Sequence, residues 1–180
     1  STSTPTATDA RPARPRGRLM PLEALATALQ ASGLSALLRS SIWLYPLVNT
    51  GHVVGIALLF GAIVPLDLRL LGCFRRTPLE HLASTLVPVA ITGLVLALCT
   101  GSLLFVTQPL DYVTEPLFGI KLALLGAAVL NALLLRRSPR WRWMGVTPGA
   151  PPQRAWRLHG LLSIVLWLGV ITAGRLIGYR

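Results

Sequence analysis

Two long stretches without a charged residue constrain this chain more than any other feature of its sequence. Residues 42–66 and 82–106 each run for 25 positions without Asp, Glu, Lys or Arg. A helix needs about 20 apolar residues to cross the hydrocarbon core of a bilayer, which is about 30 Å thick. The whole chain is only 13% charged, against roughly 25% in an ordinary soluble domain. The sequence therefore predicts membrane-spanning helices.

Two further apolar segments follow in the C-terminal half of the chain. Residues 116–135 contain Lys121 and Asn131 as their strongly polar members, and residues 158–174 contain only His159 as an ionisable group. Backbone polar groups find no water inside a bilayer, so each segment is expected to be helical. We predict an all-α membrane protein in which residues 41–180 form a four-transmembrane-helix bundle. Its spans are expected at about 42–68, 80–107, 116–136 and 156–178.

The N-terminal region lacks the long apolar runs of the rest of the chain. Residues 1–18 are rich in Ser, Thr, Pro, Ala and Arg, a composition that cannot bury a core, so we expect a disordered tail. Residues 19–40 repeat leucine at helical spacing, with Glu23 and Thr27 on the other face. This segment is too polar to span a membrane. It is predicted to be an amphipathic interfacial helix, with Gly33 as the point at which it can break.

The basic residues indicate how the spans are oriented. The net charge is +11, from 17 basic and 6 acidic side chains, and sixteen of the basic residues are arginines. Most of them flank apolar segments, where arginine anchors helices, so we expect no nucleic-acid partner. Connections 69–79 and 136–157 are arginine-rich, whereas the connection between them carries Asp111 and Glu115 and no basic residue. The positive-inside rule places both basic loops in the cytoplasm, although the arginines of the N-terminal tail favour the opposite orientation.

Three histidines lie in or beside the predicted spans, and ionisable groups in a membrane are candidate functional residues. Histidines from different helices of a four-helix bundle can bind the iron of a b-type haem. His81 and His159 begin their spans on the same predicted side, so they are the expected haem ligands, with His52 as a third candidate. The alternative is that His52, about 15 Å deep at 1.5 Å per residue, makes an interhelical hydrogen bond, while the other two lie among lipid headgroups.

The first two predicted spans each have a polar face. In the first span Tyr45, Asn49, His52 and Gly55 are separated by four, three and three residues, so this face is expected to point into the bundle. Gly51 and Gly55 form a small-xxx-small pair, which permits close approach of a helix or a flat ligand. The corresponding face of the second span consists of His81, Thr85, Pro88, Thr92 and Cys99.

Charged and amide residues in and near the ends of the spans form a second candidate site. Its members are Asn49, Asp67, Arg69, Asn131, Lys121 and Arg175. Asp67 is expected to pair with an arginine in a structural cluster that holds the helix ends, and Asn131 ends its span on the same side. Lys121 and Arg175 lie on the opposite side, where they either anchor their helices or bind a lipid headgroup or an anionic ligand.

Several short motifs together resemble a known family. They are Trp43-Leu44-Tyr45-Pro46-Leu47 leading to His52, Asp67-Leu68-Arg69-Leu70-Leu71-Gly72, Thr100-Gly101-Ser102-Leu103-Leu104-Phe105, Phe118-Gly119-Ile120-Lys121, Asn131-Ala132, and Trp167-Leu168-Gly169 leading to Gly174-Arg175. Over about residues 21–179 this set is similar to a family of small bacterial four-span inner-membrane proteins with a domain of unknown function. The resemblance implies a bacterial inner (cytoplasmic) membrane and no established activity. A more distant likeness to copper-resistance membrane proteins and b-type cytochromes rests on histidines in helices alone.

Three functions remain open from the sequence. The first is a non-catalytic integral membrane subunit or accessory protein of a bacterial inner-membrane complex, because no catalytic constellation is present. Its partners would be the lipid bilayer, other membrane subunits or a second copy of the chain. The second is a redox protein that carries haem b, and the third is a small metal or solute transporter, for which four spans are few. Cys73 and Cys99 share no metal-ligand spacing, so we infer neither a zinc site nor a disulfide.

Overall fold

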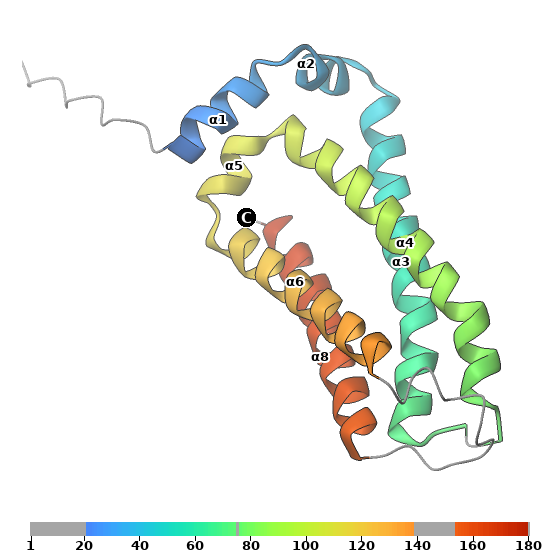
Figure 1. The fold of residues 1–180 in the computed structure, drawn as a ribbon. Helices are drawn as coiled ribbons and strands as arrows, with labels where there is room; N and C mark the ends of the chain where they lie inside the picture. Colours follow the sequence, from blue (N-terminus) through green and yellow to red (C-terminus); the bar gives the residue numbers. More distant parts are fainter. Residues whose placement is uncertain (1–20, 75, 139–153, 180) are drawn as a thin grey trace, which may run out of the picture.

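The computed structural model describes residues 21–74, 76–138 and 154–179, and the expected tail and most of the third connection lie outside these ranges. Within them the chain forms seven helices and no strand (Figure 1). The helices are α1 (Pro21–Gln30), α2 (Gly33–Ser40), α3 (Leu44–Leu71), α4 (Leu79–Thr107), α5 (Pro109–Thr114), α6 (Pro116–Arg137) and α8 (Arg154–Ile177).

Helices α3, α4, α6 and α8 are long and apolar enough to cross a membrane. Their bounds differ from the four predicted spans by only a few residues. Helix α3 ends where Gly72 adopts a φ of 105°, a left-handed conformation that glycine reaches without steric strain. The chain is thus an all-α, multi-pass membrane protein, which confirms the predicted fold class.

The four spans pack as two helical hairpins. Helix α3 packs along α4, α6 packs along α8, and the hairpins are joined where α3 contacts α8. The backbones of α4 and α6 do not come close to each other, although the Phe105 and Phe118 rings meet beside α5. Figure 1 shows the two pairs spread apart toward the end where α5 lies. Each helix of a closed four-helix bundle has two neighbours. Here α4 and α6 each have one neighbouring span, so the seam between them is open.

Glycines bring α3 and α4 into direct backbone contact. A Cβ atom built on Gly93 would lie 2.5 Å from the backbone nitrogen of Leu59, and one built on Gly55 would lie 2.7 Å from that of Ala97. No larger residue fits either position without separating the helices. Small residues in register are what lets membrane helices approach closely. The predicted Gly51 and Gly55 pair therefore faces a helix and not a flat ligand.

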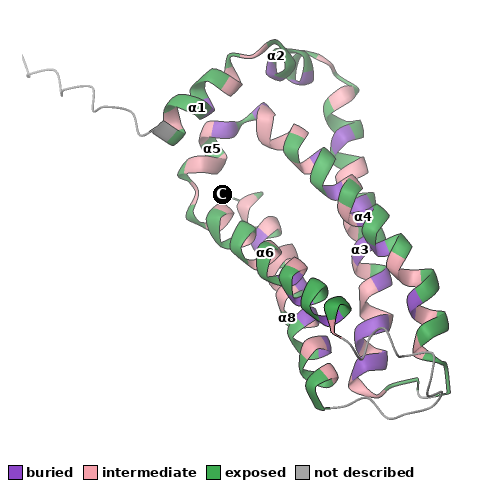
Figure 2. Cartoon of the chain, in the orientation of Figure 1, coloured by how far each residue is buried: buried purple, intermediate pink, exposed green. Residues whose placement is uncertain are grey.

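The buried core is a narrow strip where α3 meets the other spans. It contains Leu59, Ala62, Ala90, Ala128 and Trp167. Figure 2 shows buried positions along the contacting faces and exposed positions along the outer faces of α4 and α6. Most of the exposed side chains on these outer faces are apolar, as expected where the surrounding solvent is lipid.

Helices α1, α2 and α5 lie together at the end of the spans opposite the connection between α3 and α4 (Figure 1). The amphipathic segment expected at residues 19–40 is divided into two helices. The break comes just before Gly33, because the Ser32 hydroxyl accepts a hydrogen bond from the Ser35 backbone N–H at 3.3 Å and caps α2.

Helix α5 was not predicted. It starts at Pro109, a position where the missing N–H of proline costs no hydrogen bond.

An aromatic cluster holds α5 between α4 and α6. The Tyr112 ring lies 5.9 Å from the Phe105 ring and 5.3 Å from the Phe118 ring, and these two phenylalanines stack at 5.4 Å. Such aromatic pairs stabilise a contact beyond the area that they bury. Burial raises the pKa of Tyr112 above its ordinary value, and the nearby Tyr45 and Asp111 raise it further.

Candidate functional site

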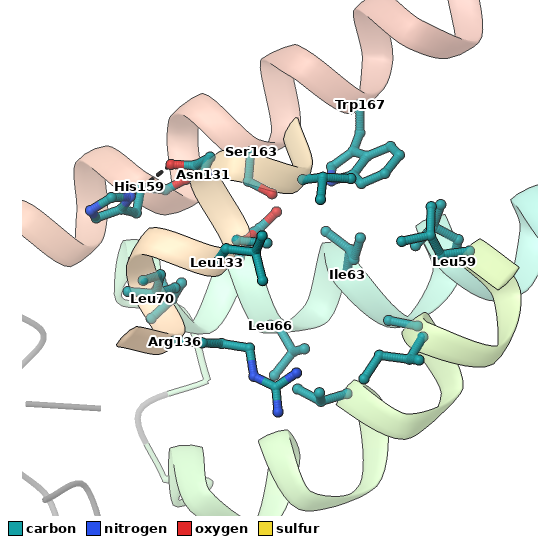
Figure 3. A pocket seen from close by; sticks show the side chains of 18 of the residues that line it. Leu59, Ile63, Leu66, Leu70, Asn131, Leu133, Arg136, His159, Ser163 and Trp167 are labelled. Atoms are coloured by element: carbon teal, nitrogen blue, oxygen red, sulfur yellow. Dashed lines mark hydrogen bonds between the residues drawn. The ribbon is translucent and has the colours of Figure 1, made fainter. Parts of the chain in front are cut away.

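A cavity of about 180 Å³ lies between the two hairpins, in the half of the spans nearest the connection between α3 and α4 (Figure 3). All four spans line it. The wall from α4 is entirely apolar and includes Val87, Ala90 and Ile91. The polar residues of the cavity come from α3, α6 and α8 and are Asp67, Asn131, Arg136, His159, Ser163 and Trp167.

Asn131 and His159 form a paired contact between α6 and α8. The Asn131 Nδ2 donates to the His159 backbone oxygen at 3.0 Å, and His159 Nδ1 lies 2.7 Å from Asn131 Oδ1 (Figure 3). An amide oxygen only accepts hydrogen bonds, so Nδ1 of His159 carries the proton. The pair therefore holds the second hairpin together and fixes the orientation of the imidazole at the cavity wall.

Asp67 lies where α3 meets α8. Gly160 makes this contact close, because a Cβ atom built on it would lie 3.0 Å from the Asp67 backbone oxygen. The Asp67 side chain is 5% exposed and interacts with Ser163, and its Oδ2 atom is buried without a hydrogen-bond partner. The sequence predicted an ion pair with an arginine. Within the described ranges Asp67 forms no such pair, since its side chain interacts with Ser163 and its Oδ2 atom has no partner, while Arg69 donates from Nε to the Thr77 oxygen at 2.8 Å.

Trp167 is the cavity residue that sequence reasoning missed. It is 4% exposed, and its Nε1 atom is buried without a hydrogen-bond partner. The signal was present in the sequence, because His159, Ser163 and Trp167 follow one another at four-residue intervals on one face of α8. Figure 3 shows Ser163 and Trp167 projecting from α8 toward α3.

His52 lies outside the cavity, in the contact between α3 and α4. Its Nδ1 is 2.9 Å from the Ala97 backbone oxygen and 3.2 Å from Thr100 Oγ1. The carbonyl can only accept, so Nδ1 is the donor. The imidazole packs against Gly101, where a Cβ atom would come within 3.0 Å of the ring. Of the two alternatives for this residue, the geometry matches the interhelical hydrogen bond.

The three histidines do not fit the paired axial ligands of a haem. His81 is exposed and does not line the cavity, whereas His159 does line it and is bound to Asn131. His52 is part of a different helix contact. The cavity lined by His159 thus does not include His81, and the pairing of these two histidines on a haem stays a prediction. Within the ranges that the structure describes, no three His, Cys, Asp or Glu side chains are grouped to hold a metal ion.

The remaining polar candidates do not join Asp67 and Asn131. Asn49 is exposed, as is Tyr45, so the polar face expected to point inward from α3 does so only at His52 and Gly55. Lys121 lies against Gly174, with its Cε 3.4 Å from where a Cβ atom would be. Arg175 donates to the Tyr179 hydroxyl at 3.0 Å and lies over its ring.

The polar face predicted for α4 points outward. Its members His81, Thr85, Pro88, Thr92 and Cys99 are all exposed. The hydroxyls of Thr85 and Thr92 donate to backbone oxygens one turn earlier in their own helix, at 3.2 Å and 3.0 Å. Threonine side chains satisfied in this way can face lipid without a partner helix.

The fold and the cavity together define the class of this chain, a multi-pass helical membrane protein with a partly polar cavity within its spans. No protein-family model, curated protein or solved structure matches the chain.

Proposed function

We propose that this chain is a non-catalytic integral membrane subunit or accessory protein of a bacterial inner-membrane complex, and that α6 docks against a helix of its partner. The observation that carries the proposal is an uncovered stripe of small residues on α6. Gly119, Ala123 and Gly126 recur at intervals of four and three residues, and all three are exposed. The stripe lies opposite the face on which Ala128 and Leu135 are buried.

The α3–α4 contact indicates what such a stripe is for. There Gly55 and Gly93 allow two backbones to touch, and their replacement by any larger residue would force the helices apart. On α6, in contrast, a Cβ atom built on Gly119 or Gly126 meets nothing within 4 Å. Small residues on a lipid-facing surface contribute little to the stability of an isolated helix. Glycine lowers the stability of the helix relative to alanine. A second membrane helix packed on the stripe explains why they occur there.

Location and sidedness are further parts of the proposal. The resemblance of the chain to the family of small bacterial four-span proteins supports a location in the bacterial inner membrane. Arg69, Arg76, Arg136, Arg137, Arg154 and Arg157 all belong to the two connections at one end of the spans. The positive-inside rule favours the cytoplasm for that end, which puts α1, α2 and α5 on the outer side. The exposed leucines of α1 and α2 then lie in the outer interface of the bilayer.

The size of the complex in mild detergent tests this proposal. Native electrophoresis of membrane extracts should show the tagged chain in a complex larger than its own mass of 19.4 kDa. Gly126→Leu should shift the chain to the single-chain position, because the added side chain meets a partner and no atom of the chain itself. Ile120→Phe is the matched control, since Ile120 is 51% exposed on a neighbouring face of the same helix.

The control variant should leave the complex intact. A complex whose mass is an integer multiple of the chain mass would identify the partner helix as another copy, and a mass that is no such multiple would identify a different subunit. The proposal fails if the unaltered chain migrates alone, or if Gly126→Leu and Ile120→Phe migrate alike.

A further inference from the structure

We propose that the cavity between the hairpins binds an uncharged, membrane-soluble phenol, such as a hydroquinone, whose hydroxyl group hydrogen-bonds to Asp67 and Trp167. This site is separate from the stripe on α6 and does not depend on it. The two residues come from different helices, α3 and α8, and both line the same cavity.

The polar atoms available to a ligand are few and well defined. Asp67 Oδ2 and Trp167 Nε1 are both buried without a partner, on side chains that are 5% and 4% exposed. Such atoms are costly to bury and are normally paired in native structures. The amide of Asn131 is already engaged with His159. Of its buried polar atoms, the cavity therefore offers one carboxylate oxygen and one indole N–H that lack partners, with the exposed Arg136 guanidinium at its edge.

The chemistry of these two atoms selects the ligand. An indole N–H can only donate a hydrogen bond, and an ionised carboxylate oxygen can only accept one. A hydroxyl group donates one hydrogen bond and accepts others, so it is the simplest group that has a partner to offer to each of the two atoms. An ammonium group can donate to Asp67 but offers nothing to Trp167. Arg136, which lines the same cavity, also disfavours a cation.

The size and walls of the cavity select the rest of the molecule. An apolar protein cavity of about 150 Å³ holds a benzene ring. This cavity, at about 180 Å³, has room for one substituted ring. Its α4 wall presents only apolar side chains, which suits the ring, whereas the two unpartnered atoms belong to α3 and α8 on the other walls.

Access from the bilayer is open along the seam between α4 and α6. The backbones of these helices do not come close to each other beside the cavity, and the Phe105 and Phe118 rings meet farther along, next to α5. The cavity residues Ile91 on α4 and Leu133 on α6 are 46% and 44% exposed. A ligand dissolved in the lipid can therefore enter sideways without crossing the aqueous phase. This route suits a hydrophobic phenol, which concentrates in the bilayer.

Two probes that differ in one hydrogen-bond donor test the site. The full chain in lipid nanodiscs is titrated with 4-ethylphenol and with 4-ethylanisole by calorimetry, and the signal of empty nanodiscs is subtracted. The phenol can satisfy both Asp67 and Trp167, whereas the methyl ether can accept from Trp167 but has no proton to donate. We expect saturable binding and a Kd at least roughly tenfold lower for the phenol, because the ether leaves the buried Asp67 oxygen without a donor. This comparison needs no variant to fold.

Variants separate the two contacts. Asp67→Leu should remove the preference for the phenol, because neither probe then finds an acceptor. Trp167→Phe keeps an aromatic ring but removes the N–H, so it should weaken both probes by a similar factor. His81→Ala is the control, since His81 is exposed and outside the cavity, and it should bind both probes as the unaltered chain does.

Three results would overturn the proposal. The first is equal affinity for phenol and ether on the unaltered chain, or no saturable binding of either. The second is a preference for the phenol that persists in Asp67→Leu. The third is tighter binding of the cationic analogue 4-ethylbenzylamine than of 4-ethylphenol, which would make Asp67 a site for amines.

Discussion

Replacing Gly93 by alanine should separate the first hairpin. The added Cβ atom would lie 2.5 Å from the Leu59 backbone nitrogen and 2.8 Å from the Gly55 backbone oxygen. Ordinary carbon contacts are about 3.5 Å or longer, so the helices must move apart by about 1 Å at this crossing. Backbone atoms on the opposing helix cannot move aside as a flexible side chain does.

The expected cost follows from that displacement. Overpacking a tight contact costs about 1–3 kcal/mol, and the separation also lengthens the 2.9 Å contact between His52 Nδ1 and the Ala97 oxygen. We expect Gly93→Ala to lower the free energy of unfolding by about 2 kcal/mol. Gly61→Ala is the matched control on α3, because its Cβ atom meets nothing within 4 Å. Alanine is the better helix former by about 1 kcal/mol, so the control should be at least as stable as the unaltered chain.

Unfolding in mixed micelles with increasing dodecyl sulfate, followed by far-ultraviolet circular dichroism, measures both variants. The Gly93→Ala transition should move to a lower dodecyl sulfate fraction, while the Gly61→Ala transition should not. Equal midpoints for the two variants would refute the close backbone contact between α3 and α4.

Two further predictions follow from the histidines and from the aromatic cluster. Because no two of His52, His81 and His159 share a cavity, the protein purified in mild detergent should show no Soret band, oxidised or dithionite-reduced; a band lost in His52→Ala would contradict this geometry. Because burial raises the pKa of Tyr112, the unfolded chain loses this proton first, so the contribution of Tyr112 to stability should be constant well below about pH 10 and fall as the pH rises through and above it. Tyr112→Phe should reduce that fall, and an unchanged pH profile would exclude the cause.

The number and positions of the spans could be predicted because each span carries its own signal. Charge-free length is a property of consecutive residues, and in a bilayer it leaves the backbone only the helical solution. The break before α2 was nearly located for the same reason, since Ser32 and Gly33 act within one helical turn. Helix α5 was missed because six residues that start at Pro109 produce no apolar period long enough to detect.

The candidate site was only partly predictable. Asp67, Asn131 and His159 stood out in the sequence because polar groups are rare in spans, and these three do line one cavity. Their partners did not stand out. Nothing local indicates that Asn131 binds His159 or that Asp67 lacks an arginine, and the spacing that puts Trp167 on the face of His159 and Ser163 does not show that this face lines a cavity.

The sequence by itself determined that this chain is a helical, multi-pass membrane protein, because hydropathy and helix formation depend on residues close together along the chain. The tertiary structure alone decided which faces meet. The contact of α3 with α8 brings Asp67 beside Ser163, and the distance between the backbones of α4 and α6 leaves the seam open beside the cavity. Lipid is as apolar as a leucine face, so hydropathy does not distinguish lipid contact from helix contact. Only the close fit of small residues such as Gly55 and Gly93 does so.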